Sequence, residues 1–297
     1  MQKANWTTDD ILNVKGKVAV VTGGNSGLGK ETARVLAQKG VKVILAVRST
    51  DRGEDAAIEI RKEFPKSYVE VMKLDLSSLA SVKSFAKEFL GRYEHLDFLI
   101  NNAGVMVPPY TKTEDGFELQ FGTNHLAHFA LTGLLLPLLE STEDSRIVTI
   151  SSVAHLTGDV NFHDLAWEQR KYDAPKAYAD SKIANLYFTY ELARKLNKSS
   201  IKVLAAHPGW TSTNLQKNWR LFRLLNPFFA QKPEMGALPT LRAATDPDAQ
   251  SGDYFGPSGW QEVRGYPKKV ASNKRSNDKE IADNLWRASE KLTGIKY

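Results

Sequence analysis

The stretch Thr22-Gly23-Gly24-Asn25-Ser26-Gly27-Leu28-Gly29 decides the fold that we expect for this chain. It follows the apolar run Val18 to Val21 and opens a segment with helical periodicity at about Gly27 to Lys39. At a strand-to-helix turn, glycines permit positive backbone angles and the close approach of a pyrophosphate, whose charge lies at the helix N-terminus. The spacing G-x-x-x-G-x-G differs from the commoner G-x-G-x-x-G fingerprint. An ordinary glycine-rich turn is the alternative, but the position after a first strand favours dinucleotide binding.

Short apolar runs, each followed by a longer amphipathic stretch, recur along the first two hundred residues. This alternation predicts parallel strands joined by helices through right-handed crossovers, which is an α/β doubly wound parallel sheet with helices on both faces. The expected strands are Lys17 to Thr22, Val41 to Val47, Tyr68 to Lys73, Leu96 to Asn101, Arg146 to Ser151 and Ile201 to Ala206. The expected helices are Gly27 to Lys39, Asp51 to Phe64, Leu79 to Tyr93, Glu114 to Leu139 and Pro175 to Lys198.

The domain organisation follows from where this pattern ends. The first two hundred residues contain no linker or repeat, so we expect residues 1–297 to form a single dinucleotide-binding catalytic domain. After Ala206 the sequence His207-Pro208-Gly209 breaks the strand, and bulky apolar residues mix with Arg and Lys. We interpret residues 210–231 as a substrate lid and residues 256–297 as a C-terminal extension, with a helix at roughly Asp278 to Leu292.

Composition excludes several kinds of chemistry. The chain has 40 Lys plus Arg, 34 Asp plus Glu and no Cys, with a net charge of +6. It therefore has no disulfide, thiolate nucleophile, Cys-ligated zinc or iron–sulfur cluster. The densest basic run, Arg264 to Lys279, favours a solvated surface over a nucleic-acid site. The longest apolar stretch, Phe129 to Leu139, is well below the roughly 18–20 residues of a membrane span. We expect a soluble, cytoplasmic protein.

The end of the second expected strand suggests which dinucleotide is bound. A carboxylate there accepts hydrogen bonds from a free ribose 2′-hydroxyl, whereas an arginine suits a 2′-phosphate. Val47 occupies the expected place of the carboxylate and Arg48 follows it. The sequence thus predicts NADP(H) over NAD(H), with Arg48 paired to the phosphate. The alternative is that Arg48 only caps a surface turn.

A tyrosine and a lysine four residues apart carry the second chemical signal. Tyr178 and Lys182 project from the same face of an expected helix. A neighbouring ammonium favours the phenolate, which lowers the pKa of the phenol and makes Tyr178 a plausible acid–base group for carbonyl and alcohol interconversion. The spacing alone occurs often by chance. Expected strand ends add Ser151-Ser152 and Asn102-Ala103-Gly104 to the same crevice, and Asn124 lies on the next helix.

In order, these motifs resemble the short-chain dehydrogenase/reductase superfamily over nearly the whole chain, which implies a Rossmann-type fold. The resemblance assigns the catalytic tetrad to Asn124, Ser152, Tyr178 and Lys182. It assigns the adenine-contacting acid to Asp75, followed by Leu76. The cofactor contacts that we expect in all are Gly23, Asn25, Ser26, Gly27, Leu28, Gly29, Arg48, Asp75, Leu76, Asn102, Ala103, Gly104, Tyr178, Lys182, Pro208, Gly209, Thr211 and Thr213.

Within the superfamily, the chain resembles the retinol dehydrogenase and WW-domain oxidoreductase branch. The resemblance rests on Ser151 to His155, Phe162 to Leu165, Asn124 to Phe129 and the Ser-to-Tyr gap of 26 positions. The position of Arg48 agrees with the preference for NADP that is usual in that branch. The chain departs from the branch in having no hydrophobic N-terminal anchor and no WW module. The family resemblance also implies a homodimer through the helices expected at 114–139 and 175–198, although some relatives are monomers.

The resemblance implies hydride transfer between NADPH and a carbonyl carbon, with Tyr178 as proton donor. Ser152 would hold the carbonyl oxygen, Lys182 would lower the phenol pKa and bind the nicotinamide ribose, and Asn124 would position a relaying water. Apolar residues between Trp210 and Phe229 suggest a lipophilic substrate, or else ordinary core or a subunit contact. His125 with His128, and His155 with His163, lack a third ligand at useful spacing, so no metal is expected. A non-catalytic NADP(H) sensor and an epimerase or dehydratase are the alternative functions.

Overall fold

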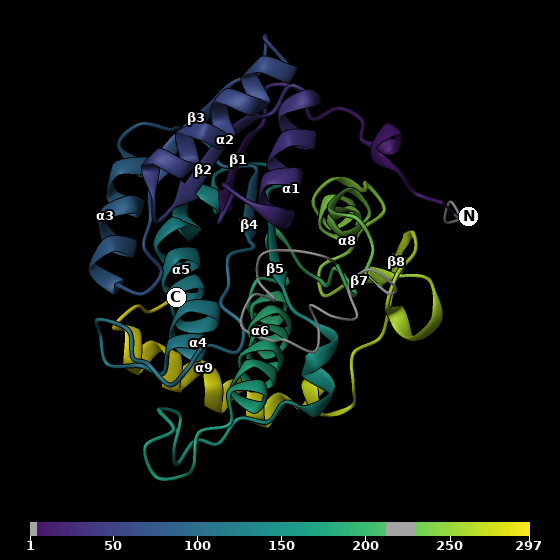
Figure 1. Cartoon of the computed structure of the whole chain (residues 1–297). Coiled ribbons are helices and arrows are strands. Elements are labelled where there is room, and N and C mark those ends of the chain that lie inside the picture. The colour runs from purple at the N-terminus through teal and green to yellow at the C-terminus, as the bar shows by residue number, and fades with distance from the viewer. Residues whose placement is uncertain (1–4, 212–229) are drawn as a thin grey trace.

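The computed structural model of the chain describes residues 5–211 and 230–297 (Figure 1). Within these residues, eight strands form one sheet in the order β3-β2-β1-β4-β5-β6-β7-β8. The pairs are parallel except for β7 with β8, which is antiparallel. The strands are β1 (Val18–Thr22), β2 (Lys42–Val47), β3 (Val69–Lys73), β4 (Phe98–Asn101), β5 (Arg146–Ile150), β6 (Lys202–Ala206), β7 (Tyr254–Pro257) and β8 (Pro267–Lys269).

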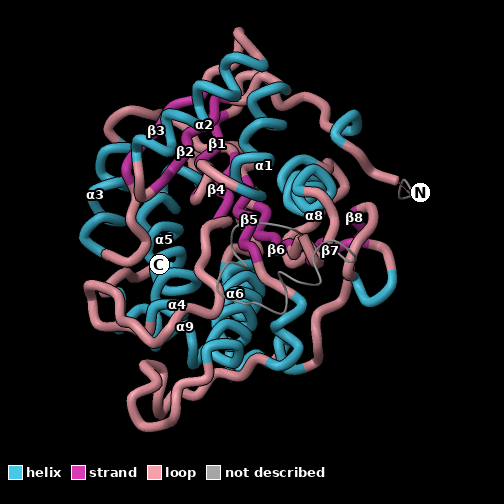
Figure 2. Tube along the Cα trace, viewed as in Figure 1, coloured by secondary structure: helices cyan, strands magenta, loops and turns pink. Residues whose placement is uncertain are grey.

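Helices cover both faces of the sheet, and Figure 2 shows the strands between the helical layers. The α-helices are α1 (Gly27–Gln38), α2 (Thr50–Glu63), α3 (Leu79–Leu90), α4 (Leu119–Phe121), α5 (Ala127–Glu140), α6 (Ala174–Lys195), α8 (Pro233–Thr245) and α9 (Lys279–Thr293). Shorter turns are η1 (Thr8–Asp10), η2 (Gly122–Leu126), η3 (Val153–Thr157), η5 (Trp260–Glu262) and η6 (Arg275–Asn277). The predicted fold class, an α/β doubly wound sheet, is confirmed.

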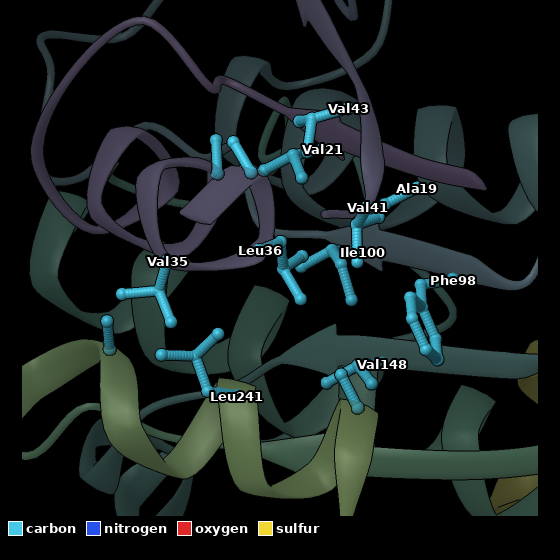
Figure 3. Packing of buried hydrophobic residues seen from close by; sticks show 14 of the residues in the cluster. Ala19, Val21, Val35, Leu36, Val41, Val43, Phe98, Ile100, Val148 and Leu241 are labelled. Atoms are coloured by element: carbon cyan, nitrogen blue, oxygen red, sulfur yellow. The ribbon is translucent and has the colours of Figure 1, made fainter. Parts of the chain in front are cut away.

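Alternation along the strands divides the core into two layers. In β1, Ala19 and Val21 pack into the cluster beneath α1, α2 and α8, part of which is drawn in Figure 3. Val18 and Val20 pack into the opposite cluster, beneath α3, α5 and α6. Because side chains alternate across a strand, a continuous apolar run is needed to fill both layers.

The chain order of the strands creates a crevice. The sheet grows outward from β1 to β2 and β3, then returns to the other side of β1 as β4. At such a switch point, the loops after neighbouring parallel strands diverge and leave a crevice at their carboxyl ends. The loops after β1, β4 and β5 all lie at this edge, where the sequence placed its motifs.

Two parts of the fold differ from the sequence expectation. The helix expected at 114–139 is divided into α4, the π-helical turn η2 and α5. The residues directly before α4 form a turn with an isolated bridge between Lys112 and Glu118. The sequence did not predict α8, β7 or β8. Pro239 and Gly236 weaken the helical signal of α8, and β7 and β8 are only four and three residues long.

The expected C-terminal helix is present as α9, and it packs on α5 and α6. Trp286 of α9 lies with its ring centroid 5.1 Å from that of Phe129 and 6.0 Å from that of Phe188. The Tyr297 hydroxyl donates a hydrogen bond to the Phe129 carbonyl over 2.6 Å. The helices to which the resemblance assigned a dimer contact are therefore partly covered by α9 of the same chain.

Candidate active site

The glycine turn has a backbone that only glycine fits without strain. Gly23 and Gly27 adopt φ of +66° and +54°, values that L side chains rarely adopt. A Cβ on Gly29 would lie 2.5 Å from both the Asn102 side-chain nitrogen and the Gly23 carbonyl oxygen. Ser26 caps α1 with extended backbone and makes no side-chain capping hydrogen bond. The first-turn amides of α1 therefore suit an anion such as a pyrophosphate.

A cavity of about 1270 Å³ lies at the carboxyl edge of the sheet. It is large enough for a dinucleotide together with a small substrate. Nearly all predicted site residues line it: Gly23, Asn25, Ser26, Gly27, Leu28, Gly29, Arg48, Asp75, Leu76, Asn102, Ala103, Gly104, Ser152, Tyr178, Lys182, Pro208, Gly209 and Thr211. Asn124 lies behind the wall, and Thr213 is outside the described residues, as is most of the predicted lid at 210–231.

Tyr178, Lys182 and Ser152 meet in this cavity. Tyr178 and Lys182 lie one turn apart on α6, and the Lys182 ammonium is 5.6 Å from the centroid of the Tyr178 ring. Lys182 donates a hydrogen bond of 3.0 Å to the carbonyl of Ile150, the last residue of β5. Ser152 follows two residues later and caps η3 by accepting from Ala154. Buried contacts between α6 and the end of β5 thus fix the relative positions of the three side chains.

The predicted lowering of the Tyr178 pKa is wrong for the protein's own groups. Burial raises the pKa of Tyr178 to about 12, and a hydrogen bond with Ser152 offsets this only in part. Burial also lowers the pKa of Lys182 to about 8. The sequence argument counted the charge of the ammonium and neglected the desolvation of both groups. A phenol with a raised pKa stays protonated at neutral pH, which suits a proton donor.

Asn124 lies in the π-helical turn η2 and is fully buried. Its side chain accepts a hydrogen bond of 2.8 Å from the Val105 amide and donates to the Val105 carbonyl and the Ser181 hydroxyl. A Cβ on Gly104 would lie 3.1 Å from the Asn124 oxygen and 3.6 Å from the Lys182 nitrogen. Asn124 thus holds the loop after β4 close to α6, and a side chain at position 104 would crowd the Asn124 oxygen.

Arg48 and Asp75 lie at the outer part of the cavity. Arg48 is exposed, and among the described residues its guanidinium has no ion-pair or hydrogen-bond partner. One oxygen of Asp75 accepts from the amide and the hydroxyl of Ser77, at 2.9 and 2.7 Å. Asp75 is therefore held in place, whereas Arg48 is available to an anion.

The other end of the cavity contains residues that the sequence did not point to. Glu262 and Val263, on the loop between β7 and β8, line it together with His155 and Leu156. The Glu262 carboxylate lies 2.9 Å from Nε2 of the buried His207. The loop is held against the Pro208-Gly209 turn, because the Trp210 amide donates to the Val263 carbonyl over 2.8 Å. Two short strands far along the chain bring these groups in, and no local motif marks them.

Residues 5–211 and 230–297 contain no group of three or more His, Cys, Asp or Glu side chains arranged to hold a metal ion. No helix in the described part of the chain is long and apolar enough to cross a membrane.

Comparison with known proteins places this site in a family. The short chain dehydrogenase family matches residues 17–223. Retinol dehydrogenase 12 of Mus musculus is 44% identical over 292 residues, which cover 96% of this chain and 89% of that protein. Retinol dehydrogenase 13 of Homo sapiens is 41% identical over 294 residues, which cover 95% of this chain and 86% of that protein.

Solved structures agree in fold. The crystal structure of an uncharacterized protein from Mycobacterium paratuberculosis is 42% identical, has a TM-score of 0.84 and covers 99% of each chain. The RhlG/NADP active-site complex of Pseudomonas aeruginosa has a TM-score of 0.67 at 24% identity, covering 82% of this chain and 94% of that chain. This last likeness concerns the fold.

The chain belongs to the short chain dehydrogenase family, and it is therefore an oxidoreductase that acts on CH–OH groups with a nicotinamide acceptor. Within that family its sequence is similar to the retinol dehydrogenases. The predicted family and branch are confirmed.

Proposed function

We propose that this chain is an NADP(H)-dependent oxidoreductase that interconverts a carbonyl and an alcohol on a lipophilic substrate. The observation that carries the proposal is the meeting of Ser152, Tyr178 and Lys182 in one cavity with the glycine turn. A simple dinucleotide sensor needs the turn alone. The tyrosine and lysine serve an acid–base step, so their place in the same cavity favours catalysis over sensing.

The cofactor contacts are proposed from the fit of the cavity. The amides at the start of α1, which have no side-chain cap, suit the pyrophosphate. Gly29 packs closely against Asn102, and its lack of a side chain leaves the backbone accessible to the pyrophosphate. Asp75 suits the adenine end and Pro208, Gly209 and Thr211 the nicotinamide end. Thr213 remains a prediction from the sequence.

Preference for NADP(H) rests on Arg48. The end of β2 offers a guanidinium that has no ion-pair or hydrogen-bond partner within residues 5–211 and 230–297, and Val47 stands at the preceding position instead of a carboxylate. An arginine can hold a 2′-phosphate by charge-assisted hydrogen bonds. The Pseudomonas structure with NADP has the same fold, which is compatible with this preference.

The bound nicotinamide supplies or accepts a hydride, and the protein supplies orientation and proton transfer. Tyr178 holds a proton on its phenol oxygen and delivers it to the substrate oxygen as charge develops there. The Ser152 hydroxyl hydrogen-bonds that same oxygen and stabilises its charge. Lys182, charged below its pKa of about 8, favours the phenolate that remains. Asn124 fixes the loop wall beside Lys182, and we keep its predicted part in a water relay as a proposal.

The substrate class is proposed from the end of the cavity near Glu262 and from the relatives. Val153, Ala154, Leu156 and Val263 give that end apolar walls. Relatives that are 41% and 44% identical are named retinol dehydrogenases, and retinol is a lipophilic alcohol. The bulky residues that first suggested a lipophilic pocket, between Trp210 and Phe229, lie largely outside the described residues.

The experiment is a panel of carbonyl compounds incubated with the purified protein and either NADPH or NADH, followed by the loss of reduced-nicotinamide absorbance. We expect oxidation of NADPH, with lipophilic aldehydes or ketones giving the highest kcat/KM. Binding of NADPH without oxidation by any carbonyl would support the sensor instead. Turnover of nucleotide sugars without net loss of NADPH would support an epimerase or dehydratase. Preference for small hydrophilic carbonyls would remove the lipophilic part of the proposal.

Three further predictions from the sequence remain proposals. They are a single catalytic domain over 1–297 with a lid at 210–231 and an extension at 256–297, a cytoplasmic location, and a homodimer. Because α9 covers part of α5 and α6, a homodimer through these helices would include α9 in its contact. Size-exclusion chromatography with light scattering tests the last point.

A further inference from the structure

His128 is a buried histidine that lies between the glycine turn and the π-helical turn η2. It is the second residue of α5 and is 1% exposed. Its Nδ1 lies 3.1 Å from the Asn124 carbonyl oxygen, and its Nε2 lies 2.9 Å from the Thr22 hydroxyl. One imidazole ring thus joins a residue of the predicted tetrad to the last residue of β1.

The Thr22 hydroxyl is in turn the acceptor for the loop after β4. The backbone amides of Asn102 and Ala103 each donate to it over 2.9 Å, and the Asn102 amide also lies 2.9 Å from the Ile100 carbonyl oxygen. The Asn102 side chain donates to the Thr22 carbonyl over 2.8 Å. Thr22 is fully buried, so these amides are held by the protein alone. The backbone on which Asn102, Ala103 and Gly104 line the cavity therefore depends on where this hydroxyl points.

Hydrogen-bond counting fixes the protonation state of His128. A carbonyl oxygen only accepts, so Nδ1 carries the hydrogen, and in a neutral ring Nε2 then accepts from the Thr22 hydroxyl. The hydroxyl has one hydrogen and two possible acceptors, Nε2 of His128 at 2.9 Å and the Ile100 carbonyl at 3.3 Å, of which Nε2 is the nearer. Its two lone pairs accept from the amides of Asn102 and Ala103. A second hydrogen on Nε2 would leave the hydroxyl with three donors. Burial lowers the pKa of His128 to about 4, and the charge of Lys182 also lowers it, against the hydrogen bond to Asn124.

We propose that His128 is a positioning residue. Through the Thr22 hydroxyl it holds the loop at Asn102–Gly104, and through its Nδ1 it holds the Asn124 carbonyl. One buried side chain thus supports both the loop assigned to dinucleotide binding and a residue assigned to proton transfer. The inference rests on the proposed function, because it assigns these two groups to cofactor and catalysis. The neighbouring His125 points elsewhere: its Nε2 lies 2.9 Å from the Ser289 hydroxyl of α9.

Two substitutions separate the two sides of the ring. In His128→Asn, the shorter amide retains a donor near the Asn124 carbonyl but does not reach Thr22. In His128→Gln, the longer side chain retains an acceptor for Thr22 but gives up the donor to Asn124. We expect the Asn variant to raise the Kd of NADPH about tenfold with a smaller loss of kcat. We expect the Gln variant to lower kcat about tenfold with a Kd near that of the wild type.

The control is His125→Asn, which removes another buried histidine contact at the last residue but one of the π-helical turn η2. A loss of packing alone predicts the same changes in Kd and kcat for all three variants, in proportion to their loss of Tm. That result would overturn the proposal. A split between Kd and kcat in the two His128 variants, absent from the His125 variant, would support it.

A second measurement needs neither a folded His128 variant nor the cofactor. Thr22→Val removes the hydroxyl and retains the shape of the side chain. Amide hydrogen exchange of the protein without NADPH should show exchange at Asn102 and Ala103 at least about tenfold faster than in the wild type. A third measurement uses NADPH with Thr22→Val, His128→Asn and the double variant. The Kd of NADPH should rise in Thr22→Val as in His128→Asn, and the double variant should lose no more than the larger single effect.

Unchanged exchange at these two amides, or fully additive losses of NADPH affinity, would contradict the coupling. If the wild-type protein binds neither NADPH nor NADH, the proposed function fails. In that case the hydrogen-exchange result still decides whether His128 and Thr22 hold this loop.

Discussion

The two ends of the cavity are built in different ways. At the cofactor end, the glycine turn, Arg48 and Asp75 follow β1, β2 and β3 directly, so each group lies where its own strand ends. At the substrate end, Glu262 and Val263 come from a loop between two short strands, and a hydrogen bond to Trp210 holds that loop in place. In the proposed function, the contacts to the cofactor therefore follow from local sequence, whereas the walls for the substrate depend on contacts between distant segments.

The largest effect is expected where the two ends meet, at Tyr178. In Tyr178→Phe the ring packing remains and the proton is lost, so kcat should fall about 1000-fold, since general acid–base groups contribute about 10²- to 10⁴-fold. The Kd of NADPH should change little. Tyr190→Phe, on the same helix outside this cavity, is the matched control. Steady-state kinetics and fluorescence titration measure the two effects, and retained turnover would rule out Tyr178 as the acid.

Gly29→Ala should damage the cofactor end alone. The added Cβ would lie 2.5 Å from backbone and from Asn102, and such overpacking costs about 1–3 kcal/mol. The Kd of NADPH should therefore rise about 10- to 100-fold, while the relative kcat/KM of different carbonyl substrates stays the same. Gly91→Ala is the control, because a Cβ there meets nothing closer than 3.5 Å. A changed order of substrate preference in Gly29→Ala would show that the two ends are not separate.

The pH dependence of kcat should report Lys182. Burial lowers its pKa to about 8, so the ammonium is present below pH 8 and is lost as the pH rises through that value. Because Tyr178 stays protonated over this range, we expect kcat for carbonyl reduction to fall about tenfold per pH unit above 8. Lys182→Arg, which keeps its charge, should remove this fall, although its turnover will be lower. A wild-type profile that is flat to pH 10 would contradict the assignment.

Arg48→Ala tests which of the two dinucleotides, NADPH or NADH, the cofactor end prefers. Loss of charge-assisted hydrogen bonds at an exposed position should raise the KM of NADPH about tenfold and leave that of NADH unchanged. Arg52→Ala, one turn further along at an exposed position outside the cavity, is the control. An unchanged KM for NADPH would dispose of the predicted preference for NADP(H).

Glu262→Gln should have the smallest effect and only at the substrate end. The substitution removes a negative charge that lines the cavity and retains the side-chain volume. We expect kcat/KM for anionic carbonyl substrates to rise about threefold relative to neutral ones, with the Kd of NADPH unchanged. Glu234→Gln, exposed on α8, is the control. Equal effects on all substrates would indicate that Glu262 acts through the structure of the loop.

The same contrast explains what the sequence predicted. The six strands that it identified, among them β1 and β5, are four to six residues long and mostly apolar, and their ends differ from the expected ones by at most two residues. The predicted tetrad residues could be assigned because family motifs fix their order. The π-helical turn around Asn124 could not, since no residue type marks it.

Other features were missed because they depend on packing. The proposed role of His128 comes from groups 106 and four residues away in the chain. From the sequence, the histidines are interpreted as packing or pocket-lining residues rather than metal ligands, and their spacing indicates no partner for His128. The direction of the Tyr178 pKa was wrong because burial is a property of the folded protein. The loop containing Glu262 needs β7 and β8, whose short runs give little signal.

A crystal structure of the protein with NADPH tests the central claim most directly. We predict the pyrophosphate against the first-turn amides of α1, the 2′-phosphate against Arg48, and the nicotinamide between Lys182 and the Pro208-Gly209 turn, within reach of Tyr178. NADPH bound in the opposite direction, or outside the cavity, would contradict the assignment of a cofactor end and a substrate end.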